Sequence, residues 1–443
     1  MARAETSSGR GTFYGSGAVA GAFMKTVVIG AGIVGIATAY FLNKRGHDVT
    51  VVERRPGAAL ETSFGNGGVV HASEVEPWSQ PGMPAKILRW LGREDAPLLL
   101  RPEAVPHMWR WGIGFLRSCT VYRFRRNTIA NLHLALHSLK TLHQVRAETG
   151  IEYDSAARGV IKTYHDPKSL AAGARNAELL GPHGLLSHVL SAQECVALEP
   201  ALAATSGRLA GGLYFPRDEV GDCYKFTEGL ARHLAERKVC FLYETSVSRL
   251  VTNRHAVDAV ETSRGRLSAD CFVVAAGSFT SFLLRPLGIT VQIYPVKGLS
   301  ITVEAAPWRG AVRMPVIDDS GLFGLVPIGA RLRVSGSAEV ARYDAQPSSK
   351  RADAIVARVI RAFPDFGRCY NSATAKIWAG LRPVTPTGTP YMGQTRLPNL
   401  FVNAGHGHLG WTMGCGAGEV VAALASNAHP AIDLADFPQA VNA

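Results

Sequence analysis

Apolar and polar positions near the start of the chain follow two different spacings. Short apolar runs at Lys25–Ile29 and Asp48–Val52 predict buried strands, and the apolar positions from Ile33 to Leu42 predict a helix that ends near Gly46. A strand, a tight turn, a helix and a second strand form a crossover unit. Such units are typical of parallel sheets, whose neighbouring strands need a long connection.

Similar patterns recur along the rest of the chain. Apolar residues at helical spacing predict helices at Asn127–Thr149, Asp222–Glu236, Ser349–Phe363 and Leu409–Ala425. Further buried strands are predicted at Arg158–Tyr164, Val239–Tyr243 and Cys271–Ala275. Ser191, followed three residues later by Glu194, fits the capping box that begins a helix.

A third group of segments alternates more strictly between apolar and polar residues. These segments, Tyr294–Val303, Val312–Ile317 and Arg331–Ser335, predict an antiparallel sheet. Pro315 lacks an amide hydrogen, which either places its strand at a sheet edge or weakens the prediction of a strand there. The parallel-type strands come from the start, the middle and the end of the 443-residue chain. We therefore expect two domains, one of them discontinuous in sequence with the other threaded between its parts.

The composition, 47% hydrophobic and 19% charged residues, is that of a globular protein and excludes a disordered chain. No apolar run reaches the roughly 18–20 residues of a membrane span. Residues 1–23 lack the pattern of a secretion signal, and we interpret them as an extension or tag before a fold that begins at Met24. Seven cysteines, odd in number and without metal-type spacing, favour a reducing compartment and predict no metal site.

The formal net charge of +12 leaves several kinds of anionic partner open. The chain contains no nucleic-acid-binding module, so we expect no nucleic acid. Basic residues gather only in short clusters such as Arg123–Arg126 and Arg331–Arg333. These clusters predict either a solvated surface or a patch that contacts anionic lipid headgroups.

A glycine motif, Gly30-Ala31-Gly32-Ile33-Val34-Gly35, stands between the first predicted strand and the first helix. Gly30 permits a sharp turn, Gly32 lets backbone amides approach a pyrophosphate, and Gly35 allows the helix to lie close to the sheet. Glu53 ends the second strand about 20 residues on, where a ribose hydroxyl needs an acceptor. This combination predicts a dinucleotide site and disfavours NADP, whose 2′-phosphate the carboxylate would repel.

Two later segments favour FAD over NAD. Residues 273–279 (Val-Val-Ala-Ala-Gly-Ser-Phe) follow a predicted strand, and residues 403–413 form a strand end, a glycine-rich turn around His406 and His408, and a helix start. A helix N-terminus in that place can face the N1/C2-carbonyl edge of an isoalloxazine, where negative charge gathers on reduction. No separate acid–base constellation of the kind an NAD enzyme supplies is evident.

With these segments in place, the sequence resembles the D-amino acid oxidase-like superfamily, and in detail the bacterial D-amino acid dehydrogenases. The resemblance runs from about Lys25 to the C-terminal region through Gly57-Ala58-Ala59-Leu60-Glu61-Thr62-Ser63, Pro77-Trp78, Pro81-Gly82, Glu199-Pro200-Ala201-Leu202, Gly221-Asp222-Cys223, Tyr294-Pro295-Val296-Lys297-Gly298 and Trp378-Ala379-Gly380-Leu381-Arg382-Pro383. Thr387 stands where the family usually has Asp. The stretch Phe64–Glu74 departs from the family after Gly68, and because we expect it near the flavin, it bears on substrate choice.

The resemblance implies an α/β fold. One domain would be an FAD-binding Rossmann-like domain of the glutathione-reductase type, formed by residues 24–75, 215–290 and 375–443. The other would be a substrate domain built on an antiparallel sheet, formed by residues 76–214 and 291–374. The implied reaction is transfer of a hydride from the Cα of a small amino acid, expected to be a D-amino acid, to flavin N5. The resulting imino acid hydrolyses to a 2-oxo acid and ammonia, and the electrons pass to a quinone, a dye or another non-oxygen acceptor. The implied location is cytoplasmic, with peripheral attachment to the inner face of the plasma membrane as an alternative.

Other activities on the same scaffold stay open at this stage. An opine or D-hydroxyproline dehydrogenase, or an oxidase that uses oxygen, would share these motifs. An FAD-binding redox sensor or subunit is the alternative outside catalysis. The sequence predicts no particular oligomeric state.

Arg382 is the main candidate for substrate binding, because the resemblance places it at the substrate carboxylate. A guanidinium offers two parallel donors to a carboxylate and stays charged when desolvated; an internal ion pair is the alternative. Lys297 either approaches the flavin or is a solvated surface residue. Tyr294 and Tyr370 either offer a hydroxyl to the pocket or pack in the core.

Either His406 or His408 contacts the flavin or substrate, or both are hydrogen-bonded turn residues. Val247 is assigned to the adenine by family position only. The complete set of expected cofactor contacts is Gly30, Gly32, Ile33, Val34, Gly35, Glu53, Arg54, Ser63, Asn66, Gly67, Gly68, Val247, Ala276, Gly277, Gly380, His406, Gly407, Leu409, Gly410, Trp411 and Thr412.

Overall fold

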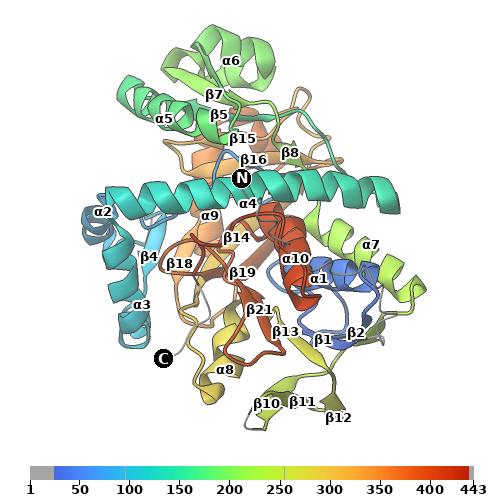
Figure 1. The fold of residues 1–443 in the computed structure, drawn as a ribbon. Helices are drawn as coiled ribbons and strands as arrows, with labels where there is room; N and C mark the ends of the chain where they lie inside the picture. The colour runs from blue at the N-terminus through green and yellow to red at the C-terminus, as the bar shows by residue number, and fades with distance from the viewer. Residues whose placement is uncertain (1–23, 95, 254, 439–443) are drawn as a thin grey trace, which may run out of the picture.

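The computed structural model describes residues 24–94, 96–253 and 255–438, and the interpretation of residues 1–23 lies outside this range. Two large sheets organise the chain, and the 29-residue helix α4 (Val121–Thr149) crosses the molecule in front of them in Figure 1. In the described part, no helix is long and apolar enough to cross a membrane.

The first sheet has six strands in the order β20-β21-β13-β1-β2-β9. All neighbours are parallel except β20 and β21. The strands are β1 (Lys25–Ile29), β2 (Asp48–Val52), β9 (Cys240–Leu242), β13 (Cys271–Val274), β20 (Tyr391–Gln394) and β21 (Leu400–Ala404). The prediction that parallel strands from the start, middle and end of the chain meet in one sheet is confirmed.

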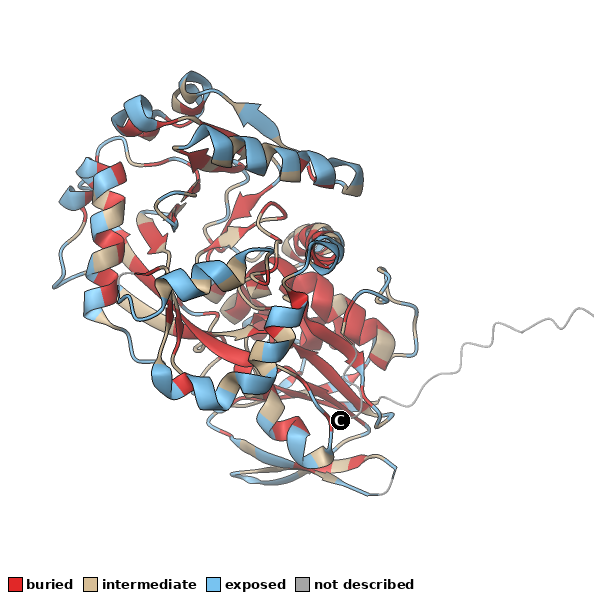
Figure 2. Cartoon of the chain, turned by 90° about the vertical axis from the view of Figure 1, so that its left-hand side faces the viewer, coloured by how far each residue is buried: buried red, intermediate tan, exposed pale blue. Residues whose placement is uncertain are grey.

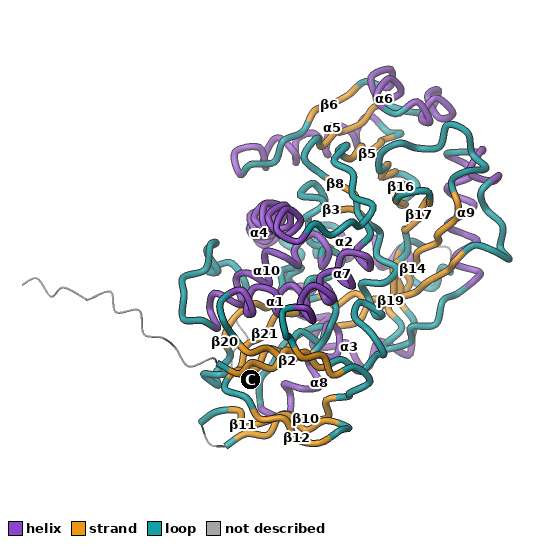
Figure 3. The backbone as a smooth tube through the Cα atoms, turned by 90° about the vertical axis from the view of Figure 1, so that its right-hand side faces the viewer, coloured by secondary structure: helices purple, strands orange, loops and turns teal. Residues whose placement is uncertain are grey.

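The two faces of this sheet are covered differently. Val28 of β1 belongs to a core that includes helices α1 (Ile33–Lys44), α7 (Cys223–Glu236) and α10 (Gly410–Ala425). Val27 and Ile29, which alternate with it, pack toward the three-stranded sheet β10 (Val247–Thr252), β11 (Val257–Thr262) and β12 (Gly265–Ser268). Figure 3 shows the helices on one side of the strands and the small sheet on the other.

The second sheet has ten strands, mostly antiparallel, in the order β4-β18-β14-β17-β16-β15-β5-β7-β6, with β19 paired along β14. The strands are β4 (Leu98–Leu100), β5 (Val160–Tyr164), β6 (His188–Leu190), β7 (Gly211–Phe215), β14 (Tyr294–Glu304), β15 (Val316–Asp318), β16 (Phe323–Ile328), β17 (Arg331–Ser335), β18 (Ala338–Val340) and β19 (Lys376–Val384). The edge position expected for the strand with Pro315 is wrong. Strand β15 begins only after that proline, so it pairs fully with β16 on one side and β5 on the other.

The remaining elements surround these sheets. The capping box at Ser191 and Glu194 is confirmed and begins α6. The sequence patterns did not predict the helices α2, α3 and α5. The bounds are β3 (Val69–Val70), β8 (Glu219–Val220), α2 (Met83–Trp90), α3 (Val105–Ser118), α5 (Pro167–Leu180), α6 (Ala192–Leu198), α8 (Thr280–Leu284) and α9 (Ser349–Ala362).

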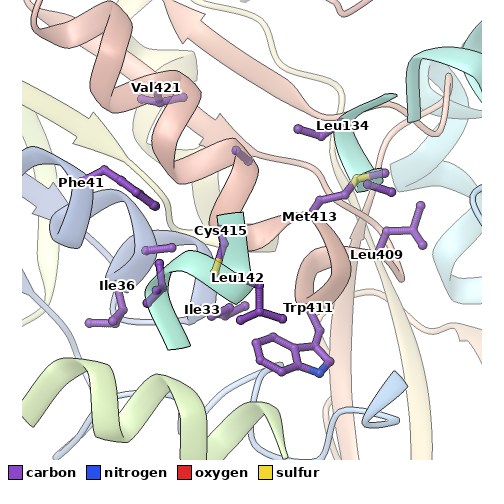
Figure 4. Packing of buried hydrophobic residues seen from close by; sticks show 14 of the residues in the cluster. Ile33, Ile36, Phe41, Leu134, Leu142, Leu409, Trp411, Met413, Cys415 and Val421 are labelled. Atoms are coloured by element: carbon purple, nitrogen blue, oxygen red, sulfur yellow. The ribbon is translucent and has the colours of Figure 1, made fainter. Parts of the chain in front are cut away.

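Helices α1 and α10 are apolar on nearly all sides because they pack against each other, with α7 covering α1 and α4 covering α10. Figure 4 shows Ile33 of α1 and Leu142 of α4 close to Cys415 of α10, and Met413 of α10 beside Leu134 of α4. Apolar burial on this scale is the main stabilising contribution to a fold. It fixes the first and last helices of the described chain against each other.

Candidate cofactor and substrate site

The carboxyl ends of β1, β2, β13 and β21 open onto a cavity of about 560 Å³. Much of the opposite wall comes from β14 and β19 of the second sheet, through Gly298–Ser300 and through Trp378, Gly380, Leu381 and Arg382. Ligands in open parallel sheets bind at the carboxyl ends of the strands. The cavity therefore lies where the topology predicts a cofactor, with the second sheet closing it.

The glycine motif shapes one end of this cavity. Gly30 adopts a φ of +108°, and its amide donates to the Val52 carbonyl oxygen at 2.8 Å. A Cβ on Gly35 would lie 1.9 Å from the Gly30 carbonyl oxygen, so only glycine lets α1 approach the turn this closely. The α1 N-cap, Gly32, has no capping side chain, and the Ile33 amide donates to the Ser63 hydroxyl at 3.1 Å. With no side chain at Gly32, the backbone at the N-terminus of α1 is open to a pyrophosphate, whose negative charge the helix dipole favours.

Glu53 lines the cavity beside this turn and is 8% exposed. Its Oε2 accepts from the Ala31 amide at 2.8 Å, and its Oε1 accepts from the Arg55 amide at 2.9 Å. A carboxylate oxygen accepts more than one hydrogen bond, so each oxygen can still receive a ribose hydroxyl. Val247 and Arg54 also line this end, and the Arg54 guanidinium lies 3.9 Å from the centroid of the Phe279 ring.

His406 stands at the opposite end, in the turn before α10. It is 3% exposed, and its Nε2 is buried without a hydrogen-bond partner among the described residues. Burial lowers the pKa of His406 to about 3, so the ring is neutral at pH 7. An unpaired buried nitrogen beside a helix N-terminus fits the polar edge of an isoalloxazine. The residues present at both ends of the cavity therefore fit a flavin dinucleotide.

The loop after β2 closes the middle of the cavity through Ser63, Asn66 and Gly67. The Asn66 carbonyl oxygen accepts from Arg333 Nη1 at 2.7 Å. Arg333 is 5% exposed, which corrects the expectation that the Arg331–Arg333 cluster lies on a surface. Its guanidinium instead fixes the backbone of the cofactor loop from the second sheet.

Arg382 lies on β19 and lines the cavity. Its Nη1 donates to the Ser337 carbonyl oxygen at 2.9 Å, and its Cζ lies 5.8 Å from the centroid of the Trp78 ring. In the described ranges no carboxylate forms an ion pair with Arg382. Burial lowers the pKa of this guanidinium to about 10, so it keeps its charge at pH 7. A Cβ on Gly298 would lie 2.1 Å from Arg382 Nη1, so the glycine next to Lys297 makes room for this side chain.

Other predicted site residues lie outside the cavity wall. Lys297 is neither solvated nor in the cavity: its Nζ lies 2.7 Å from Asp344 Oδ2 and 3.3 Å from Glu339 Oε2. The Tyr294 hydroxyl donates to the Ala104 carbonyl oxygen. The Tyr370 hydroxyl donates to Asp353 at 3.0 Å, away from the cavity.

The predicted cofactor contacts divide in the same way. Four of them do not line the cavity: Gly35, Gly68, Leu409 and Thr412. The others line it: Gly30, Gly32, Ile33, Val34, Glu53, Arg54, Ser63, Asn66, Gly67, Val247, Ala276, Gly277, Gly380, His406, Gly407, Gly410 and Trp411. Thr412, for example, accepts from the His71 amide at 3.2 Å through its hydroxyl.

Sequence reasoning assigned no role to His71, Glu74 or Trp378, which also line the cavity. Trp378 belongs to the motif that contains Arg382, and the alternation along β19 could have revealed it. His71 and Glu74 belong to the stretch that departs from the family pattern. That departure was the available signal for them.

The fold and the cavity define a two-sheet flavoprotein, and the chain belongs to the FAD dependent oxidoreductase (DAO) family, whose pattern matches residues 25–424. Its cofactor is accordingly FAD. Within the family, this chain is 45% identical to the D-amino acid dehydrogenase of Paramagnetospirillum magneticum over 93% of this chain and 97% of that protein. It is 41% identical to the D-amino acid dehydrogenase of Agrobacterium fabrum over 94% of this chain and 98% of that protein.

Solved structures share the fold. A glycine oxidase from Geobacillus kaustophilus superposes with a TM-score of 0.74 at 23% identity, covering 94% of this chain and 98% of that one. An L-proline dehydrogenase from P. horikoshii superposes with a TM-score of 0.73 at 19% identity, covering 91% and 94%. The likeness confirms the predicted fold class, an FAD-binding Rossmann-like domain joined to a second, mainly antiparallel sheet.

Proposed function

We propose that this protein oxidises a small D-amino acid to an imino acid, which water hydrolyses to a 2-oxo acid and ammonia. The observation that carries the proposal is Arg382, a half-buried guanidinium that faces the FAD cavity without a carboxylate partner in the described chain. Such a group is costly to bury unless a ligand supplies its counter-charge. The carboxylate of an amino acid supplies that charge in a bidentate geometry.

The protein's part in the reaction is to bind and orient the substrate. FAD, when bound, supplies the hydride acceptor for the substrate Cα–H. Trp78 and the Ser337 carbonyl hold the Arg382 guanidinium in place, which fixes the substrate carboxylate and hence the direction of its Cα. Burial keeps His406 and His408 neutral, so neither histidine competes with Arg382 for the carboxylate. The D-configuration is supported by the similarity to D-amino acid dehydrogenases.

An anaerobic screen tests this proposal directly. Purified protein with bound FAD is mixed with D-amino acids, their L-enantiomers, opines and D-hydroxyproline, and loss of the flavin absorption is recorded. We expect bleaching by D-amino acids, with the 2-oxo acid and ammonia as products. Bleaching by opines alone, or by none of these compounds, would contradict the proposal.

We further propose that the electrons pass to a quinone or dye rather than to oxygen, at the cytoplasmic face of an anionic membrane. The support for the membrane contact is a surface formed by α2, α3 and the start of α4. Eight large apolar side chains are exposed there: Leu88, Leu91, Val105, Trp109, Ile113, Leu116, Val121 and Tyr122. In Figure 2, which looks onto the side where α2 and α3 lie, the helices in the foreground are largely coloured as exposed.

The charge of this segment favours an anionic partner. Residues 83–126 contain nine lysine and arginine residues against three acidic ones. Apolar side chains surrounded by cations are typical of helices that lie on anionic lipid. On α3, Val105, Trp109, Ile113 and Leu116 recur at helical spacing, whereas the buried side chains of this helix are Phe115 and Ser118.

Co-sedimentation with lipid vesicles and an acceptor assay test these two points. We expect binding to phosphatidylcholine vesicles only when phosphatidylglycerol is included, and weaker binding after Trp109→Ser with Ile113→Ser. The pair Leu179→Ser with Val189→Ser, which removes exposed apolar side chains elsewhere, is the control. Equal loss of binding in both pairs, or rapid peroxide formation with oxygen as acceptor, would contradict this part of the proposal.

A further inference from the structure

Glu74 places a carboxylate on the cavity wall away from the nucleotide end. It follows β3 in the stretch that departs from the family pattern, and together with His71 it lines the cavity. The other acidic residues on the wall, Glu53 and Glu61, stand at the nucleotide end, where Glu53 accepts backbone amides and Glu61 pairs with Arg54. The function described so far has no use for Glu74.

Lys162 of β5 holds this carboxylate in place. Its Nζ lies 2.8 Å from Glu74 Oε1 and 3.6 Å from Asp319 Oδ1. Burial alone would raise the pKa of Glu74, but the ammonium of Lys162 outweighs it and holds the pKa below its ordinary value. Oε2 of Glu74 makes no hydrogen bond to the described residues and is free to accept one from a ligand.

The cluster around Lys162 is acidic overall. Glu76 lies behind Glu74, and burial together with the charge of Glu74 raises the pKa of Glu76 to about 7. The negative charges of Glu74 and Asp319, together with the partial negative charge of Glu76, therefore outweigh the one positive charge of Lys162. His71 and His408 face the same region, and burial keeps both neutral by lowering the pKa of each to about 4.

Two aromatic rings connect this acidic end to Arg382. The His408 Nε2 lies 3.2 Å from the Glu74 carbonyl oxygen, and the His408 ring stacks on Trp78 with centroids 5.3 Å apart. The Arg382 Cζ lies 5.8 Å from the centroid of the Trp78 ring. Arg382, His408 and Glu74 all line the cavity, and the contacts through Trp78 and His408 link Arg382 to the backbone of Glu74. Val69, Ile317 and Val326 add apolar lining suited to methylene groups.

We propose that Glu74 binds the far end of the substrate side chain and selects D-amino acids whose side chain ends in an amine or guanidinium. This inference rests on the proposed function and extends its substrates from small to longer, cationic side chains. The α-carboxylate occupies Arg382, the methylene groups follow the apolar lining, and the terminal cation reaches Glu74 Oε2. The α-amine of the substrate lies next to the carboxylate on Arg382 and so does not reach Glu74. Only a cation at the end of the side chain can pair with it.

Matched substrates test the inference without any mutation. D-ornithine and D-lysine are compared with D-norvaline and D-norleucine, which present side chains of similar length without the charge, by kcat/KM in dye reduction. Because a hydrogen bond to a charged group changes affinity about tenfold or more, we expect the cationic substrates to be favoured by at least that factor. A ratio of one or less overturns the proposal, whereas oxidation of D-norleucine shows that the proposed function itself holds.

A pair of isosteric variants locates the effect. Glu74→Gln is expected to lower the ratio of D-lysine to D-norleucine kcat/KM about tenfold, because it removes the charge on the wall. Glu76→Gln makes the same change in the same cluster behind the wall and is expected to leave the ratio within about twofold. A ratio unchanged in Glu74→Gln, or reduced equally in both variants, overturns the assignment. Where Glu74→Gln does not retain FAD, the wild-type ratio decides.

Discussion

Replacing Arg382 with methionine separates the binding of substrate from the stability of the protein. Methionine has a similar length and an apolar end, so it fills the space beside Trp78 without a charge. Arg382 has no carboxylate partner in the described residues, and its one hydrogen bond is to the Ser337 carbonyl oxygen. The substitution therefore leaves no buried anion uncompensated, and we expect a melting temperature equal to or above that of the wild type.

The expected loss of activity follows from the same geometry. Removing one partner of a buried, hydrogen-bonded charge pair costs about 2–5 kcal/mol. At about 1.4 kcal/mol per factor of ten, kcat/KM falls roughly 30-fold to several thousandfold. The contact to the carboxylate is the same in the ground state and the transition state, so most of the loss appears as a higher KM.

The assay combines steady-state dye reduction with D-alanine, FAD content from the absorption spectrum, and thermal unfolding followed by flavin fluorescence. Arg266→Met, on the exposed strand β12, is the control for loss of one positive charge. Arg382→Lys keeps the charge but loses the two parallel donors of the guanidinium. Its kcat/KM should therefore lie between those of Arg382→Met and Arg266→Met. A value of kcat/KM within threefold of the wild type, with FAD retained, would refute the role assigned to Arg382.

Two further predictions concern the scaffold. Gly35→Ala should lose most of its bound FAD, because the new Cβ would lie 1.9 Å from the Gly30 carbonyl oxygen. Gly112→Ala, where no atom lies within 4 Å of the new Cβ, should keep its FAD, and equal FAD content in the two purified variants would contradict the reasoning. Burial raises the pKa of Asp218 to about 7, so its stabilising contribution is fully present below its unfolded pKa and is lost as pH rises toward 7. The side chain of Asp218→Asn cannot ionise. The melting temperature of this variant, relative to that of the wild type, should therefore rise between about pH 4 and pH 8. A difference that does not change with pH would contradict the pKa shift.

Local patterns predicted the parts of the site that depend on backbone shape. Gly30 and Glu53 were predicted to act together because the strand, turn and helix that join them are contiguous in sequence. The same holds for the turn that carries His406. The structure brings these segments to one cavity, as expected from strands that end at the same edge of a parallel sheet.

Side chains whose environment comes from distant segments could not be predicted in this way. Lys297 lies in a family motif, yet its surroundings are set by Glu339 and Asp344 on a different part of the chain. Glu74 resembles any loop carboxylate until β5 places Lys162 beside it. Helix α3 was not predicted because Pro106, Gly112 and Gly114 are typical of loops, although the apolar residues of this segment recur at helical spacing.

The arrangement of the six-stranded sheet has a consequence for biosynthesis. Strand β1 is separated by most of the chain from β21 and α10, which supply another part of the same cavity. A nascent chain on the ribosome that does not yet include β21 and α10 contains only part of the cofactor cavity. Formation of the complete cofactor site must therefore follow synthesis of β21 and α10, and a truncation before β21 would yield protein without bound FAD.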